Sequence, residues 1–178
     1  MRDGGPKNRT LLNKLPAMLR SGGRQKDIDA MVVILDSDSN DCVALLDKLR
    51  SVATYEGAGA KTIFRLAIEE TEAWCFGDPD ALSAAYPAAN NAAFKRYRQD
   101  TVCDTCEILA DTIHVGGAAA IRRTGWPLPG QIKHEWANRI GPLMNPDANR
   151  SPSFGKLRDG LRRLIAAPAI QPGQTPAG

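Results

Sequence analysis

Carboxylates follow directly on an apolar run at one point of the sequence. Residues 31–35 read Met-Val-Val-Ile-Leu, and Asp36, Asp38 and Asp41 come next. Because side chains of an extended chain repeat every two residues, Asp36 and Asp38 point the same way if the chain stays extended through Ser37. Two like charges about 4 Å apart repel by roughly 1 kcal/mol in water and by ~4 kcal/mol near a protein surface, so the pair favours a cation or a proton. Oxygen ligands on a short loop predict a site for Mg²⁺, or for Mn²⁺.

A second acidic group follows a second apolar run. Residues 63–68 are apolar apart from Arg65, and Glu69, Glu70 and Glu72 come after them. An apolar run that ends in carboxylates thus occurs twice within about forty residues, which is the strongest internal indication of a site. All three glutamates are candidate catalytic residues, with Glu70 or Glu69 first. The alternative is a helix whose first turn carries glutamate to complement its dipole, which accounts for at least one of them.

The sequence allows two roles for Asp41. Aspartate and asparagine are frequent helix N-caps, and a helical pattern begins at Cys42, so Asp41 or Asn40 could cap that helix. Capping is the more common role for a residue in this position. A third ligand for the metal is the alternative.

Two sets of polar side chains could bind an anion such as a phosphate. They are Lys95, Arg96 and Arg98 in a basic and aromatic run, and Arg150, Ser151 and Ser153 before the last helical pattern. The first set could contact a nucleic-acid backbone, and its alternative is a solvated helix face. The second set could hold an anion at a helix start, and its alternative is that Ser153 is a plain N-cap.

The cysteines predict neither a disulfide framework nor a strong metal site. The chain has four cysteines in 178 residues, too few for a secreted disulfide scaffold, so we expect reduced thiols. Cys103 and Cys106 have CxxC spacing, and His114 follows eight residues later. A structural zinc site needs four ligands, and no second pair lies nearby, so zinc is not favoured.

The elements that must position the acidic residues form an α/β pattern. The two apolar runs predict strands, and their continuous apolar character suits a parallel sheet covered on both faces. In such sheets ligands sit at the carboxyl ends of the strands. We expect helices at 10–22 with a bend or break at Pro16, and then at 42–53, 80–86, 106–113, 118–123, 131–140 and from about 154 to 165. Residues 1–8 are turn-like.

Composition limits the number of domains and the kinds of partner that the protein can have. A chain of 178 residues with 43% hydrophobic residues predicts one globular domain over 1–166, and the Pro-, Gly- and Gln-rich stretch 167–178 predicts a disordered tail. Net charge is only +3, so nucleic-acid binding needs local basic patches. No apolar stretch reaches the ~18 residues of a membrane span, and the first residues are no signal peptide. We expect a cytoplasmic protein without a membrane partner.

Several phrases together resemble one bacterial family, which is catalogued as domain of unknown function 4276. The phrases are Leu35 to Cys42, Ala67 to Trp74 with Gly77-Asp78 behind it, Ala85 to Pro87, and Asn149 to Phe154 ahead of Leu157 to Leu164. The resemblance covers roughly residues 3–165, and the acidic phrases are its most distinctive part. It implies a Toprim-like fold, in which a parallel sheet carries an Asp-x-Asp pair that holds Mg²⁺.

The resemblance also implies roles for particular residues. Asp36 and Asp38 match the Asp-x-Asp pair, while the catalytic glutamate that follows the first strand of Toprim-like domains has no counterpart, because residues 1–30 contain no glutamate. We therefore expect a Toprim-like domain that is truncated at its N-terminus. Such a truncation would expose a sheet edge that invites pairing with another chain, including a second copy. Members of the family are linked with partner ATPases in phage defence.

Three functions follow from these patterns. The first is Mg²⁺-dependent phosphodiester chemistry on nucleic acid, as in a Toprim-like nuclease. The second is a non-catalytic subunit that docks on an ATPase or self-associates through its open sheet edge. The third is a small-molecule phosphotransferase or phosphatase, which is weaker because no phosphate loop or nucleophile stands out.

Overall fold

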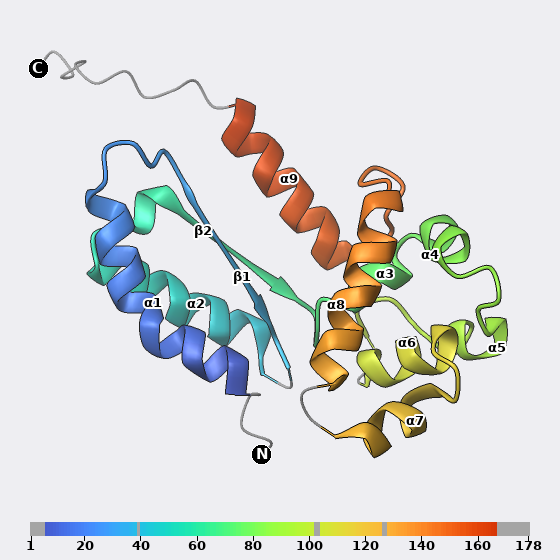
Figure 1. Ribbon diagram of the computed structural model, residues 1–178. Helices are drawn as coiled ribbons and strands as arrows, with labels where there is room; N and C mark the ends of the chain where they lie inside the picture. The colour runs from blue at the N-terminus through green and yellow to red at the C-terminus, as the bar shows by residue number, and fades with distance from the viewer. Residues whose placement is uncertain (1–5, 39, 102–103, 126–127, 167–178) are drawn as a thin grey trace, which may run out of the picture.

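The computed structural model describes residues 6–38, 40–101, 104–125 and 128–166, and it joins a small parallel sheet to a helical half (Figure 1). In chain order the elements are α1 (Pro6–Arg24), β1 (Met31–Asp36), α2 (Cys42–Tyr55), η1 (Gly59–Lys61), β2 (Thr62–Ala67), α3 (Ala73–Phe76), α4 (Pro79–Ala85), α5 (Asn91–Phe94), α6 (Thr105–Ile113), α7 (Gly117–Thr124), α8 (Leu128–Ile140), η2 (Gly141–Leu143) and α9 (Pro152–Ala166). This confirms the predicted mixed α/β class with a helical C-terminal half.

The sheet has two strands in the described part of the chain. β1 and β2 are parallel, with Met31 opposite Thr62 and Asp36 opposite Ala67. α1 and α2 lie side by side across one face of this sheet (Figure 1). Their apolar side chains form a buried cluster with the inward residues of both strands: Leu15, Leu19, Leu35, Leu49, Ala53, Ala58, Phe64 and Leu66. Both strands therefore end at the same edge of the sheet, as predicted.

On the opposite face of the sheet, the described residues cover β2 more than β1. Arg65 of β2 donates from Nε to the Lys156 carbonyl of α9 at 2.7 Å, and Gly160 leaves room for the guanidinium. On β1, by contrast, Val32 and Ile34 are 37% and 39% exposed. The prediction that this strand is covered on both faces is therefore wrong. The apolar run carries no sign of this, because the cover depends on where α9, a helix distant in sequence, packs on the sheet.

A second apolar cluster holds the helical half together. Its buried members come from α3, α4, α6, α7 and α8: Phe76, Leu82, Ala85, Leu109, Ala110, Ala118, Trp136 and Ile140. Phe76 stacks on Tyr97 with ring centroids 4.1 Å apart. The predicted helices of this half are present, with ends shifted by a few residues.

The N-terminal helix differs from the prediction in two ways. α1 begins at Pro6, so the expectation of turn-like residues is wrong for 6–8. Proline has a helical φ and needs no hydrogen-bond partner for its nitrogen at the first helical position. Pro16 lies inside α1 without splitting it. The predicted disordered tail 167–178 lies outside the described residues.

No helix in the described ranges is both long enough and apolar enough to cross a lipid bilayer.

Candidate functional site

Backbone hydrogen bonds hold the ends of the two strands together. The Ser37 N–H donates to the Ala67 carbonyl at 2.9 Å, and the Asp38 N–H donates to the Glu69 carbonyl at 3.0 Å. The Glu69 N–H donates in turn to Ser37 Oγ at 2.7 Å. Asp38 and Glu69 have φ values of 46° and 61°, so both chains turn sharply here. The chain is thus not extended through Ser37 and Asp38, although Asp36 and Asp38 still line the same pocket.

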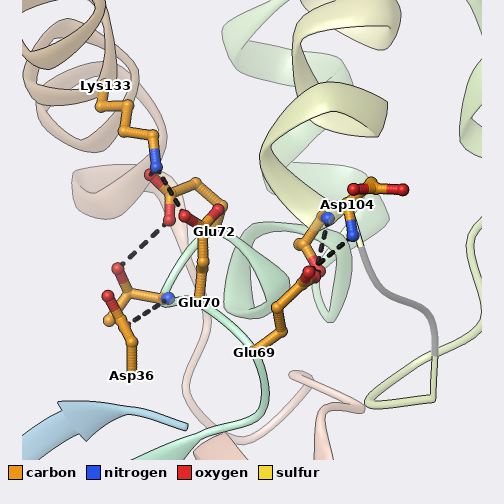
Figure 2. A network of polar contacts seen from close by, with 8 residues as sticks. Asp36, Glu69, Glu70, Glu72, Asp104 and Lys133 are labelled. Carbon is orange, nitrogen blue, oxygen red and sulfur yellow. Dashed lines mark hydrogen bonds and ion pairs between the residues drawn. The ribbon is translucent and has the colours of Figure 1, made fainter. Parts of the chain in front are cut away.

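Three carboxylates and one ammonium form a network at this edge, shown in Figure 2. We call Asp36, Glu70, Glu72 and Lys133 the strand-end cluster. Lys133 Nζ of α8 lies 3.0 Å from Glu70 Oε1 and 3.1 Å from Glu72 Oε1. Asp36 Oδ1 accepts the Thr71 N–H at 3.0 Å. The second acidic group of the sequence therefore does meet the first, and α8 supplies the cation.

The strand-end cluster has an excess of negative charge in a partly buried place. Burial, and then repulsion by Glu72, raise the pKa of Asp36 to about 6. Burial also raises the pKa of Glu70, against the attraction of Lys133. For Lys133 burial lowers the pKa, but the neighbouring carboxylates outweigh it and the net pKa is raised. The ammonium stays charged, and the carboxylates gain from any further positive charge.

Cys106 of α6 completes a group with metal-ligand spacing. Ligand atoms of Glu70, Glu72 and Cys106 lie within 4.8 Å of one another. Burial raises the pKa of the Cys106 thiol to about 12, so the sulfur is a neutral thiol near pH 7. The zinc site that the sequence does not favour is not tested, because Cys103 lies outside the described ranges; His114 stands edge-on to Trp136 with centroids 6.3 Å apart.

The strand-end cluster opens into a pocket of about 1230 Å³. Its polar lining includes Asp36, Asp38, Glu70, Thr71, Glu72, Lys133 and His134. Its apolar lining includes Trp74, Leu109, Trp136, Met144 and Phe154. The pocket therefore combines an acidic wall from the strand ends with an aromatic wall from α3, α8 and α9.

The start of α9 binds an anion, but the anion belongs to the chain itself. The Asp100 carboxylate accepts the Ser153 N–H at 2.7 Å and the Ser151 hydroxyl at 3.1 Å. Ser151 Oγ also accepts the Phe154 N–H at 3.2 Å, which makes Ser151 the cap, so the alternative of Ser153 as N-cap is wrong. Arg150 is exposed, and its backbone N–H donates to the Gly77 carbonyl at 2.8 Å.

Two other acidic candidates serve as helix anchors. The Glu69 carboxylate accepts the N–H groups of Asp104 and Thr105 at 2.6 and 2.8 Å, at the start of α6 and away from the strand-end cluster (Figure 2). Asp41 Oδ1 accepts the Ala44 N–H at 2.8 Å, which confirms the capping alternative for Asp41. Both carboxylates therefore satisfy backbone donors that a helix start leaves unpaired.

The basic run lies apart from this pocket. Lys95, Arg96 and Arg98 are exposed, and α5 ends at Phe94, so the alternative of a helix face is wrong for them. Arg96 Nη2 contacts Asp111 Oδ2 at 3.4 Å. None of the three is among the residues that line the pocket. Whether they contact a phosphate backbone stays a prediction.

Sequence reasoning missed Lys133 and Cys106 as parts of the site. Both lie in helical patterns, where a lysine or a partly buried cysteine is unremarkable in sequence. Comparisons with protein-family models, with curated proteins and with solved structures found no match to this chain. The resemblance to the domain of unknown function 4276 and to Toprim-like proteins therefore stays a prediction.

Proposed function

We propose that this protein binds Mg²⁺, or Mn²⁺, at its strand ends and catalyses phosphodiester hydrolysis in a nucleic acid. The observation that carries the proposal is Asp36, a partly buried carboxylate at the end of β1 that faces Glu72 inside a pocket. Its raised pKa, about 6, shows how unfavourable its charge is without a further cation. The family resemblance of the acidic phrases points to the same chemistry.

Asp36 and Asp38 are the residues that would hold the metal. Both residues line the pocket, and Mg²⁺ prefers hard oxygen ligands such as carboxylates, commonly using one or two of them and keeping waters besides. The neutral Cys106 thiol is a poor ligand for such a cation. Bound there, the metal would orient a phosphate and stabilise the charge that develops on it.

Glu70 and Lys133 give the site its remaining chemistry. The raised pKa of Glu70 brings this carboxylate closer to the neutral range in which a general base works best. Lys133 holds Glu70 at 3.0 Å and can neutralise charge on a neighbouring phosphate. Glu69 is assigned to the fold rather than to catalysis, because α6 occupies its carboxylate.

The test is cleavage of single- and double-stranded oligonucleotides by the purified chain, with Mg²⁺, with Mn²⁺ and with a chelator. Asp36→Asn/Asp38→Asn should lower cleavage on the order of 100-fold or more, as expected for loss of a transition-state electrostatic contact. The control is Asp47→Asn, an exposed carboxylate on α2 paired with Arg50. Cleavage that needs no metal, or that survives in the double variant, would sink the proposal.

A second candidate function is that of a partner-binding subunit. In the described residues β1 pairs only with β2, and its outward residues Val32 and Ile34 are partly exposed. An unpaired strand edge beside apolar side chains favours addition of a strand from another chain. The partner expected from the resemblance is an ATPase, and a second copy of the chain is the self-associated form.

Sedimentation over a range of concentrations tests the self-associated form. Ile34→Glu should shift a dimer toward monomer, while Val43→Glu on the exposed side of α2 should not. A wild-type chain that is monomeric throughout, and that no ATPase binds through β1, would contradict this candidate.

A further inference from the structure

The aromatic wall of the pocket has no role in metal binding. Trp74 and Phe154 are partly exposed there, and they lie edge to face with centroids 5.6 Å apart. Trp136, by contrast, is only 3% exposed and belongs to the core of the helical half. Two aromatic side chains are therefore presented to a ligand beside the strand-end cluster.

The two aromatic side chains are fixed before any ligand arrives. Trp74 Nε1 donates to Ser153 Oγ at 2.9 Å. Ser153 is 3% exposed, and the Asp100 carboxylate holds its N–H at 2.7 Å. The backbone N–H of Phe154 donates to Ser151 Oγ at the same helix start, and its ring packs edge to face against Trp74. Groups that are already ordered lose little conformational entropy on binding, so this wall suits recognition of a ligand.

The size and chemistry of the pocket restrict the ligand. Its volume, about 1230 Å³, exceeds the roughly 300–1,000 Å³ of pockets that bury a drug-sized molecule, so a metal ion with one phosphate would leave most of it unfilled. Aromatic side chains stack on nucleobases of any sequence. A flat ring joined to a phosphate, with a divalent cation between that phosphate and the carboxylates, matches both walls together.

We propose that Trp74 and Phe154 hold the nucleobase of the nucleotide whose phosphate is held at the strand ends, one ring stacking on the base and the other contacting its edge, because the two ring planes lie 67° apart. This proposal rests on the proposed function, because it places the phosphate at Asp36 and Asp38. The ligand recognised is a nucleobase together with its phosphate. It could be a free mononucleotide, or a nucleotide at the end or in the interior of a single strand. An organic cation is the competing ligand, since carboxylates and aromatic faces attract one too.

The first experiment measures binding of deoxyadenosine monophosphate to the full chain by calorimetry, with Mg²⁺ and with a chelator. Phe154→Leu removes the ring and keeps an apolar side chain, and it should weaken binding about tenfold, within the range known for loss of base stacking. Trp74→Leu should do the same, while Mg²⁺ affinity stays unchanged in both. The control is Tyr55→Leu, an aromatic residue on α2 that is 86% exposed and outside the pocket. Circular dichroism confirms that each variant is folded.

The second experiment separates the two sources of the nucleotide. Competition between the mononucleotide and a short single strand shows which of them binds more tightly, and both must lose affinity in Phe154→Leu. Where cleavage is observed, Phe154→Leu should raise KM for the single strand and leave kcat nearly unchanged, as loss of uniform binding does.

The outcomes distinguish this proposal from the proposed function. Mononucleotide binding that depends on Phe154 in a chain without metal-dependent cleavage supports the base site and removes the proposed function. Metal-dependent cleavage with mononucleotide affinity and KM unchanged in Phe154→Leu and Trp74→Leu overturns the base site alone. Binding of tryptamine in place of the mononucleotide, lost in Asp36→Asn, also overturns it and assigns the pocket to an organic cation.

Discussion

Acidic residues in two regions of this molecule are placed in opposite ways. Around the starts of α4, α6 and α9, the carboxylates of Asp78, Glu69 and Asp100 each accept backbone N–H groups. We call these three the anchored carboxylates. In the strand-end cluster, Glu70 and Glu72 share one ammonium, and Asp36 faces Glu72.

The role of a carboxylate in this molecule therefore depends on the groups that it faces. Backbone donors at a helix start are held in place by the helix, so a carboxylate that accepts them keeps the same partners. The strand-end cluster is compensated by a side chain with four rotatable bonds, and the pKa of Asp36 rises to about 6. The lysine ammonium can be replaced by another cation, whereas the backbone N–H groups of a helix start cannot. Four substitutions test this contrast, and the first should change the molecule most.

Asp78→Ala should remove the strongest anchor. Asp78 is 4% exposed and accepts the N–H groups of Ala81 at 3.1 Å and Asn145 at 2.7 Å. Losing a helix cap and leaving buried donors unpaired should lower the free energy of unfolding by about 3 kcal/mol in urea titrations. Asp80→Ala, in the first turn of the same helix, should change it by less than about 0.5 kcal/mol. Equal losses in the two variants would contradict the anchoring role.

Glu69→Gln should separate anchoring from catalysis. The amide keeps one acceptor and turns a donor toward the N–H groups of Asp104 and Thr105, so the free energy of unfolding should fall by about 1–2 kcal/mol. Cleavage at a temperature where the variant is folded should stay within about twofold of wild type, since the carboxylate lies outside the strand-end cluster. Full stability with lost cleavage would return Glu69 to the catalytic residues.

Lys133→Met should strengthen divalent cation binding. Removal of an ammonium 3.0 Å from Glu70 and 3.1 Å from Glu72 leaves these carboxylates without their cation, so Mg²⁺ affinity should rise roughly tenfold in calorimetric titrations. Lys156→Met, at an exposed position of α9, serves as the matched control. Weaker Mg²⁺ binding in Lys133→Met would show that this lysine supports the metal site instead of competing with it.

Asp36→Asn should stabilise the fold, and only at higher pH. The pKa of Asp36 is raised from 3.8 to about 6 in the folded chain, so the folded state holds the proton more tightly and the stability contributed by this group falls as pH rises from about 4 to 6. The amide removes that loss. The shift of about two pKa units corresponds to at most about 3 kcal/mol, and because Asp36 is only partly buried we expect the variant to be about 1 kcal/mol more stable above pH 6 and unchanged below about pH 4. Denaturant titrations at several pH values measure this difference. A difference of the same size at all pH values would rule out titration of Asp36 as its cause.

The sequence was sufficient for the strands, the helical second half and the meeting of two acidic strand ends. These depend on local apolar patterns and on the rule that parallel strands end at one edge. It was not sufficient for the roles of neighbouring glutamates. Glu69 has a φ of 61°, which sends its side chain to α6, whereas Glu70 turns to Lys133. A positive φ at a residue other than glycine leaves no mark in sequence.

Contacts between residues far apart in the chain could not be predicted from the sequence either. Asp100 and Ser153 are 53 residues apart, and Glu70 and Lys133 are 63 residues apart. Both contacts depend on how helices without a shared periodic pattern pack together. The serines at the start of α9 signal an anion site, as predicted, but nothing local shows that an aspartate of the same chain fills it.

In the order of synthesis, Lys133 comes long after the carboxylates that it neutralises. A ribosome that adds about 5–20 residues per second needs roughly 3–12 s to proceed from Glu72 to Lys133. During that interval Glu70 and Glu72 lack the ammonium that contacts both of them in the complete fold, and a divalent cation bound at the strand ends, as we propose, would supply positive charge in its place. Nascent chains that end before Lys133 should therefore be protected from proteases more strongly when Mg²⁺ is raised, and the completed chain much less so.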